Sequence, residues 1–134
     1  FKPLLVVEKP AKNIKKILIG YDGSRHANQV LMYAGHLAEA LKSTITVICV
    51  FSDTELAEKK GEEARAYLKS YDSELSVTTT AGHPDEEIVK AAKAGQYDLL
   101  AIGAYGNSRI KEAILGSTTE HILRFAENSV LLAK

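Results

Sequence analysis

Asp98-Leu-Leu-Ala-Ile-Gly-Ala-Tyr-Gly106 is the stretch that most constrains the fold, because an apolar run ends directly in two closely spaced glycines. Nine residues later the chain continues as Gly116-Ser-Thr-Thr-Glu120, where hydroxyl side chains meet the start of an amphipathic pattern. A glycine backbone can approach a ligand closely, and the start of a helix offers unpaired N–H groups that favour an anion. The pattern therefore predicts a strand, a glycine-rich turn, and a helix that begins with a capping box and holds a phosphate group.

Short apolar runs alternate with helical patterns along the rest of the chain. Five strands are predicted, at residues 17–19, 44–51, 75–80, 98–102 and 129–133. Four helices are predicted to follow the first four strands, starting at Ser24, Ser52, Pro84 and Ser117. Strands separated by helices predict a parallel sheet with right-handed crossovers, so the expected fold is a three-layer α/β domain.

Two finer expectations follow from the residues of these elements. The third strand, 75–80, is the least apolar and is therefore expected at an edge of the sheet. In the second helix, the apolar spacing places five residues on the inward face: Leu56, Ala64, Tyr67, Leu68 and Tyr71.

Composition excludes several classes of function. The chain has 134 residues, and its 17 basic residues balance its 17 acidic ones, so a nucleic-acid or membrane-surface partner is not expected. No apolar run reaches the roughly 18 residues of a membrane span. The single cysteine, Cys49, lies in an apolar run, which predicts a buried thiol in a reducing, cytoplasmic compartment. The histidines lack metal-ligand spacing, so no metal site is expected.

The first residues form a separate unit. Pro3-Leu-Leu-Val-Val-Glu-Lys9 resembles the predicted last strand, Ser129-Val-Leu-Leu-Ala-Lys134. One interpretation is an extra edge strand or an expression remnant, and the other is the last strand of a preceding, similar domain. Residues 1–13 are accordingly assigned to an extra strand and a linker, and residues 14–134 to the main domain.

The candidate site follows from the winding of the sheet. Ligands of open α/β sheets bind beyond the carboxyl ends of the strands, where the winding reverses. If the fourth strand returns beside the first, Asp22 and Gly103 meet at that reversal. N–H groups of residues 106–108 and 116–118 would hold phosphate oxygens, Asp22 would accept from a ribose or base, and Val50 would offer main chain to a purine. The candidate residues are Tyr21, Asp22, Val50, Gly103, Gly106, Asn107, Ser108, Gly116, Ser117 and Thr118.

Each of these residues also has a purely structural interpretation. Gly103 and Gly106 fit a tight turn after a strand, Ser117 fits a helix cap, and Asp22 fits a turn. The charges of Arg109 and Lys111 are those of a solvated loop. No residue stands out as a general base or as a group that positions a water against a phosphate, so any hydrolysis of a bound phosphate compound is expected to be slow and incidental.

The spacing G-x-x-G, nine residues, G-S resembles the ATP-binding signature of the universal stress protein family. Residues 17–24 resemble that family's first strand and 98–103 its fourth, and the similarity covers about residues 14–134. The resemblance implies a Rossmann-like, adenine nucleotide alpha hydrolase-like sheet with strand order 3-2-1-4-5. It also implies binding of ATP, with AMP and ADP as variants, and Mg²⁺ carried by the phosphates.

The family resemblance further implies a dimer formed through the last strand. Some members are tandem proteins, and there residues 3–8 would pair antiparallel with residues 129–133. Tyr21 stands where nucleotide-binding members often have a small residue or proline, and is expected to narrow the adenine site.

The leading function is an ATP-responsive regulatory module, and a second is a stress-protein module that acts only through protein contacts. A nucleotide-transforming enzyme of related fold would need a Ser-Gly-Gly-type loop, which Asp22-Gly23-Ser24 does not reproduce. A phospho-receiver domain would need an acidic pair after the first strand and an aspartate after the third, and the chain has neither.

Overall fold

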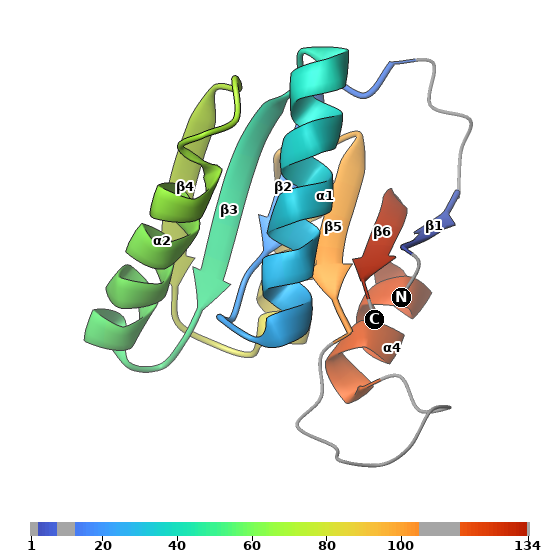
Figure 1. Cartoon of the computed structure of the whole chain (residues 1–134). Coiled ribbons are helices and arrows are strands. Elements are labelled where there is room, and N and C mark those ends of the chain that lie inside the picture. The colour runs from blue at the N-terminus through green and yellow to red at the C-terminus, as the bar shows by residue number, and fades with distance from the viewer. Residues whose placement is uncertain (1–2, 8–12, 105–115, 134) are drawn as a thin grey trace.

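The computed structural model describes residues 3–7, 13–104 and 116–133. Its sheet contains the strands β1 (Leu4–Val6), β2 (Lys16–Gly20), β3 (Thr44–Val50), β4 (Leu75–Thr80), β5 (Leu99–Gly103) and β6 (Ser129–Ala133). The helices within this part of the chain are α1 (Arg25–Leu41), α2 (Thr54–Leu68), α3 (Pro84–Ala94) and α4 (Ser117–Phe125). Strand and helix alternate from β2 onward, so each helix carries the chain back to the start of the next strand (Figure 1).

The sheet has the order β1-β6-β5-β2-β3-β4, and every neighbouring pair except β1–β6 is parallel. Omitting β1, this is the 3-2-1-4-5 order that the family resemblance implied, with the less apolar strand β4 at the edge. β2 pairs with β3 on one side and with β5 on the other, and Gly20 lies opposite Ile102. The winding therefore reverses between β2 and β5, and the predicted α/β fold is confirmed.

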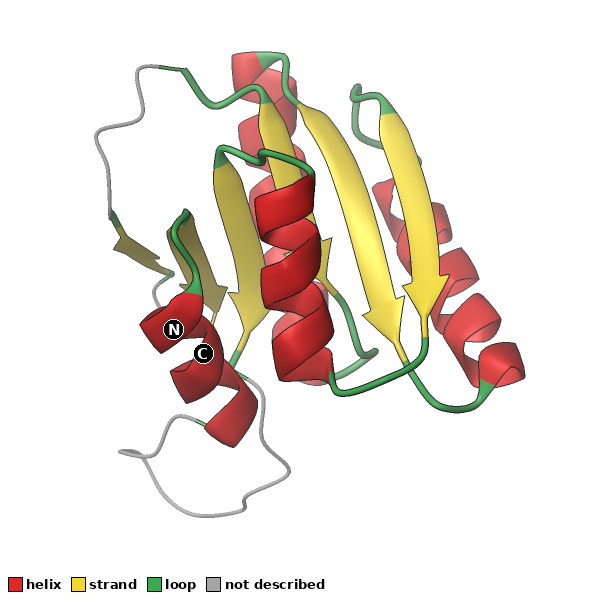
Figure 2. Ribbon diagram, turned by 180° about the vertical axis from the view of Figure 1, so that it is seen from behind, coloured by secondary structure: helices red, strands yellow, loops and turns green. Residues whose placement is uncertain are grey.

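Helices cover both faces of the sheet. α1 and α2 lie on one face (Figure 1), and α3 and α4 lie on the other (Figure 2). Alternate residues of β2 serve the two cores: Ile17 and Ile19 pack under α1 and α2, and Leu18 packs under α3 and α4. Because both faces are covered, interior strands are apolar at successive positions, as β5 is along its whole length.

Strand β1 is the exception to this burial. It pairs antiparallel with β6, with Leu5 opposite Leu131, and so confirms the predicted extra strand. The side chains of Leu4, Leu5 and Val7 nevertheless remain 57%, 50% and 59% exposed. Whether this strand belongs to a preceding domain stays a prediction.

Helix α2 differs from the sequence expectation. Its N-cap is Asp53, whose carboxylate accepts from the N–H groups of Glu55 and Leu56, and not Ser52. The buried face consists of Ala57, Gly61, Ala64 and Leu68. Small residues let this helix approach β4 closely, so the bulkier Leu56 and Tyr67 lie outside the contact at 37% and 41% exposure. The predicted inward positions of these two residues were therefore wrong.

Helix α4 also begins differently from the prediction. Its N-cap is Gly116, no side chain caps its first turn, and the predicted capping box of Ser117 and Glu120 does not form. The buried residues Thr119 and Ile122 face α3, as expected for an amphipathic helix. No helix in the described ranges combines the length and the hydropathy needed to cross a bilayer.

Candidate functional site

The turn between β2 and α1 organises one half of the site. Asp22 Oδ1 accepts from the Ser24 N–H at 2.8 Å, and Ser24 Oγ accepts from the Ala27 N–H at 3.2 Å. Gly23 completes the turn with a φ of +82°, a conformation that glycine adopts without strain. Among the described residues, no partner engages Asp22 Oδ2, so one carboxylate oxygen remains available to accept a hydrogen bond.

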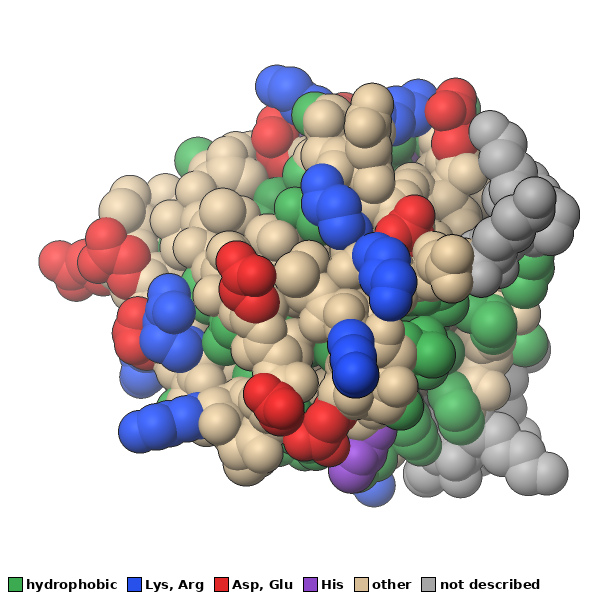
Figure 3. All heavy atoms as spheres, turned by 90° about the horizontal axis from the view of Figure 1, so that it is seen from above, with side chains coloured by type: hydrophobic (Ala, Val, Ile, Leu, Met, Phe, Trp, Pro, Cys, Tyr) green, Lys and Arg blue, Asp and Glu red, His purple; other side chains and the backbone are tan. Residues whose placement is uncertain are grey.

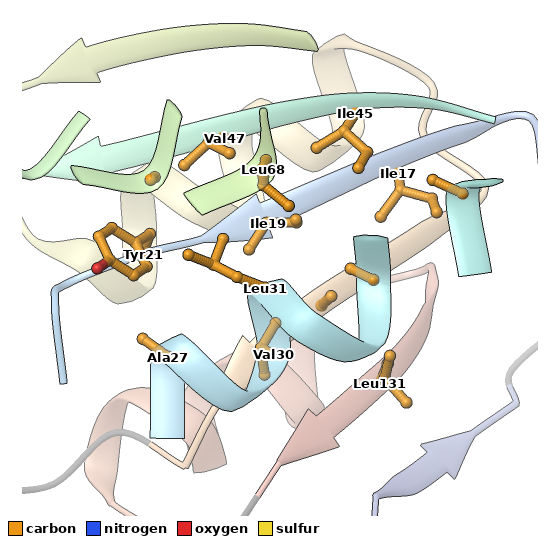
Figure 4. Packing of buried hydrophobic residues seen from close by; sticks show 14 of the residues in the cluster. Ile17, Ile19, Tyr21, Ala27, Val30, Leu31, Ile45, Val47, Leu68 and Leu131 are labelled. Carbon is orange, nitrogen blue, oxygen red and sulfur yellow. The ribbon is translucent and has the colours of Figure 1, made fainter. Parts of the chain in front are cut away.

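The Tyr21 side chain lies in the core. It is 3% exposed, and its hydroxyl donates to Asn28 Oδ1 at 2.8 Å. Figure 4 shows its ring beside the side chains that fill the layer between the sheet and α1. Burial, helped by the negative charge of Glu63, raises the pKa of Tyr21 to about 12. Tyr21 therefore packs on the α1–α2 face, whereas the Val50 side chain, at the end of β3, packs on the α3–α4 face.

Lys60 reaches the same turn from α2, and sequence reasoning missed it. A Cβ built on Gly23 would lie 2.8 Å from Lys60 Cδ and 2.9 Å from Nζ, so the lysine lies across the glycine. The Lys60 ammonium pairs with Glu63 at 3.0 Å. Alternating charges on α2 gave no signal for this position, because it depends on how α2 packs against the turn.

Gly103 closes the end of β5 against α1. A Cβ built there would lie 2.7 Å from the Ala27 nitrogen and 2.7 Å from the His26 carbonyl carbon, both of them backbone atoms. The next residue, Ala104, donates its N–H to the Ala133 carbonyl at 2.8 Å. Gly103 is thus required for a close approach between a strand end and a helix start. The predicted residues Gly106, Asn107 and Ser108, with Arg109 and Lys111, lie outside the described residues.

The start of α4 forms the other described half of the site. The Glu120 N–H donates to the Gly116 carbonyl at 3.0 Å, which closes the first turn. No acceptor among the described residues engages the N–H of Ser117 or Thr118, and Ser117 is exposed. Unpaired N–H groups at the positive end of a helix attract anions, so this helix start suits a phosphate or carboxylate.

Other features of the described chain lie elsewhere. A cavity of about 320 Å³ at the amino ends of β5 and β6 is lined by residues that include Tyr97, Asp98 and Asn128. That end of the molecule carries interspersed acidic and basic side chains (Figure 3).

No cluster of three or more His, Cys, Asp or Glu residues suited to a metal occurs in the described ranges. Cys49 is buried, as expected, and burial raises its pKa to about 11.

Comparison with known proteins gives a consistent result. The family model of the universal stress proteins matches residues 13–63 and 51–134. The chain is 35% identical over 133 residues to universal stress protein Slr1230 of Synechocystis, covering 97% of this chain and 46% of that protein. It is 33% identical over 81 residues to universal stress protein MJ0577 of Methanocaldococcus jannaschii, covering 60% of this chain and 50% of that protein. The matched residues span about half the length of each of these two relatives.

Solved structures share the fold. A universal stress protein in complex with cAMP matches with a TM-score of 0.77 and 23% identity, over 90% of this chain and 96% of that one. A universal stress protein from Archaeoglobus fulgidus in complex with dAMP matches with a TM-score of 0.75 and 18% identity, over 90% and 98% of the two chains. With nearly the whole sequence matched by the family model, this chain belongs to the universal stress protein family.

Proposed function

We propose that this chain is a regulatory domain of the stress response that binds ATP at the carboxyl ends of β2, β3 and β5. The observation that carries the proposal is that an open carboxylate oxygen and an uncapped helix start follow two neighbouring strands at the reversal of winding. Asp22 keeps one oxygen open after β2, and α4 begins without a side-chain cap after β5. The two strands are direct neighbours, which supports a site that draws on an acceptor for hydroxyl groups after β2 and on phosphate donors after β5.

The residues present suit an adenine nucleotide. Asp22 Oδ2 accepts from a ribose hydroxyl or a base amino group, and the main chain at Val50 is offered to the purine edge. The N–H groups at 116–118, together with those at 106–108, hold the phosphates, and Mg²⁺ is carried by the phosphates. Since the Tyr21 ring lies in the core, it contributes main chain rather than its side chain to this arrangement.

Proteins of the same fold support this choice of ligand. The cAMP and dAMP complexes described above show that the fold accommodates adenine nucleotides in other members. No described side chain is arranged as a general base beside the uncapped start of α4. The nucleotide is therefore proposed as a bound regulator whose occupancy biases protein contacts.

The test is to denature the purified protein without added nucleotide, identify what is released, and then titrate the protein with ATP and AMP by calorimetry. ATP is expected to co-purify or to bind, and Gly116→Val and Gly106→Val are expected to abolish binding. Gly61→Ala, in α2, is the matched control and should bind normally. Absence of both ATP and AMP binding at millimolar concentration would overturn the proposal.

We infer that β1 and β6 join this domain to a second, similar α/β unit, either another copy or a neighbouring domain. The apolar side chains of β1 are exposed, and Figure 3 shows hydrophobic atoms gathered on the side that β1 occupies. Interior strands of parallel sheets are apolar on both faces, which is the composition of β1. Sedimentation of the wild type and of Leu5→Glu tests this: association should weaken in the variant, and a wild type that is monomeric at all concentrations excludes pairing between copies.

A further inference from the structure

The cavity at the amino ends of β5 and β6 lies at the opposite end of these strands from the proposed nucleotide site. Its volume of about 320 Å³ is that of a site for a small molecule. Its walls come from residues 93 and 96–98, around the loop between α3 and β5, and from residues 127–129 at the start of β6. Most of these side chains are polar or charged, so the cavity suits a polar ligand.

Contacts within the loop between α3 and β5 fix one wall of the cavity. The Tyr97 ring lies against Gly95, where a built Cβ would come 2.2 Å from the ring carbon Cε2. The Lys16 ammonium lies 4.9 Å from the centre of the same ring and donates to the Gly95 carbonyl. Within the described ranges Lys16 forms no ion pair, so its charge does not neutralise the acidic residues of the cavity.

Two acceptor atoms of the lining residues have no donor within the described chain. Asn128 Nδ2 donates to the Tyr97 carbonyl at 2.6 Å, which fixes the orientation of the amide and leaves Oδ1 buried without a partner. Asp98 Oδ2 accepts from the Lys15 and Lys16 N–H groups at 2.9 Å and 3.0 Å, whereas Oδ1 accepts from none of the described residues. A buried acceptor without a donor is unfavourable, so these walls favour a ligand that donates several hydrogen bonds.

Two opposite charges complete the lining. Lys93 and Glu127 are exposed, and neither forms an ion pair with another described residue. An ammonium group donates three hydrogen bonds and suits the carbonyl and carboxylate oxygens, whereas a carboxylate suits Lys93. A phosphate or a simple carboxylic acid would meet the negative charges of Asp98 and Glu127, and a simple amine would leave Lys93 without a partner. The lining therefore fits a small molecule that carries both an ammonium and a carboxylate group.

We propose that this cavity binds a free amino acid. Asp98 Oδ1 and Asn128 Oδ1 accept from its ammonium group, and Lys93 pairs with its carboxylate. The proposal does not depend on nucleotide binding, because none of the residues that line the cavity belongs to the nucleotide site. The domain then responds to two different small molecules, one at each end of β5.

The experiment titrates the purified protein with each of the twenty common L-amino acids and follows the backbone amide signals by NMR. The tightest binder is then compared with its amine analogue, which lacks the carboxylate, and with its acid analogue, which lacks the amino group. Lys93→Gln and Glu127→Gln test the exposed charges, and Lys90→Gln, exposed on the same helix as Lys93 but outside the cavity, is the matched control. Asp98→Asn tests the inner carboxylate, and its amide oxygen still accepts from the N–H groups that Asp98 holds.

At least one amino acid is expected to bind and to shift the signals of residues 93–98 and 127–129. Both analogues should bind about tenfold more weakly, as should the amino acid to Asp98→Asn. Lys93→Gln and Glu127→Gln should each weaken binding about threefold, because their charges are exposed, and Lys90→Gln should not change it. Gly116→Val should leave amino acid binding intact, so that a failure of the nucleotide site is seen separately.

The proposal is overturned if no amino acid shifts these signals at millimolar concentration. It is also overturned if the amine or the acid analogue binds as tightly as the amino acid, or if Asp98→Asn and Lys93→Gln both bind like the wild type. Shifts at residues 22–24, 103–104 and 116–118 in place of the cavity residues would assign the amino acid to the other end of the sheet and would equally overturn it.

Discussion

The two helix starts that flank the reversal of winding are built in opposite ways. At α1, Ser24 caps the first turn with its own hydroxyl, and Asp22 in turn holds the Ser24 N–H. At α4, Gly116 occupies the N-cap and supplies no side chain to the first turn. Both segments follow a buried parallel strand, so topology alone does not explain the difference.

The comparison shows that two strand-turn-helix units of the same topology can have different roles. The β2–α1 turn caps its own helix through Asp22 Oδ1 and Ser24 Oγ, is held by Tyr21 in the core, and leaves Asp22 Oδ2 open. In the described residues of the β5–α4 unit, Gly103 fixes the strand end and no side chain caps the start of α4. Substitutions at the two helix caps should therefore change different quantities: loss of the Ser24 cap should lower stability, and substitutions at the start of α4 should weaken nucleotide binding.

The largest effect is expected where the two units touch. Gly103→Val places a side chain against backbone atoms of His26 and Ala27 that have no room to move, and should cost about 3 kcal/mol of unfolding free energy. Urea denaturation measures it. Gly61→Ala is the control, because its Cβ would meet side-chain atoms and no backbone: Val77 Cγ1 at 3.0 Å and Thr79 Cγ2 at 3.9 Å. Equal losses of unfolding free energy in both variants would show that the backbone contact at Gly103 costs no more than a side-chain contact.

Asp22→Asn separates the two oxygens of Asp22. The asparagine Oδ1 still accepts from the Ser24 N–H, but its amide NH₂ cannot accept from a ribose hydroxyl. Affinity for ATP should fall about tenfold, or about 1.4 kcal/mol, with little change in stability. Calorimetry and urea denaturation measure the two quantities, with Asp72→Asn, at the other end of the sheet, as control. Unchanged affinity would assign Asp22 to the turn alone.

Ser24→Ala and Ser117→Ala test the contrast directly. Loss of the Ser24 cap should cost about 1 kcal/mol of stability in the free protein. Ser117→Ala should leave the free protein within about 0.5 kcal/mol of the wild type, because Ser117 caps nothing. It should instead reduce the rise in melting temperature on adding ATP. A reversed result, with Ser117→Ala the more destabilising, would contradict the division of tasks.

Raising the pH above 9 should lower the free energy of unfolding, whereas stability near pH 7 should not change. Burial raises the pKa of Cys49 from 9.0 to about 11 and that of Tyr21 from 10.0 to about 12. Between those values the unfolded chain has released protons that the native protein retains, so stability falls as pH rises from 9 towards 12. Denaturation at pH 8 to 11 measures the slope, which Cys49→Ala should flatten. An unchanged slope in that variant would remove Cys49 as a cause.

Much of the fold could be predicted from local patterns. β6 was predicted at residues 129–133 and found there, because an interior strand is apolar throughout. Strand order was available only from the family resemblance, since apolar runs do not encode their partners. The cap of α2 was misplaced by one residue: Ser52 and Asp53 are both good caps, and the Asp53 carboxylate is the one that accepts from the first turn. The cytoplasmic location stays a prediction.

The candidate site was predictable only in part. Asp22 and the start of α4 follow strands and could be found from spacing. Lys60 reaches the β2–α1 turn through the packing of α2, which leaves no trace in its neighbouring residues. The buried position of Tyr21 was missed because a tyrosine beside a strand end gives no sign of which face its ring takes.

The pairing of β2 with β5 has a consequence for how the chain acquires its structure. Asp98, just before β5, accepts from the Lys16 N–H at 3.0 Å, although the two residues are 82 positions apart. Closing so long a loop costs conformational entropy before native contacts offset it. The elements β2, α1 and β3 are close in sequence and can associate earlier. During synthesis, the central strand should therefore keep one open edge until β5 has left the ribosome. The centre of the finished sheet is thus the part most exposed to mispairing while the chain is being made.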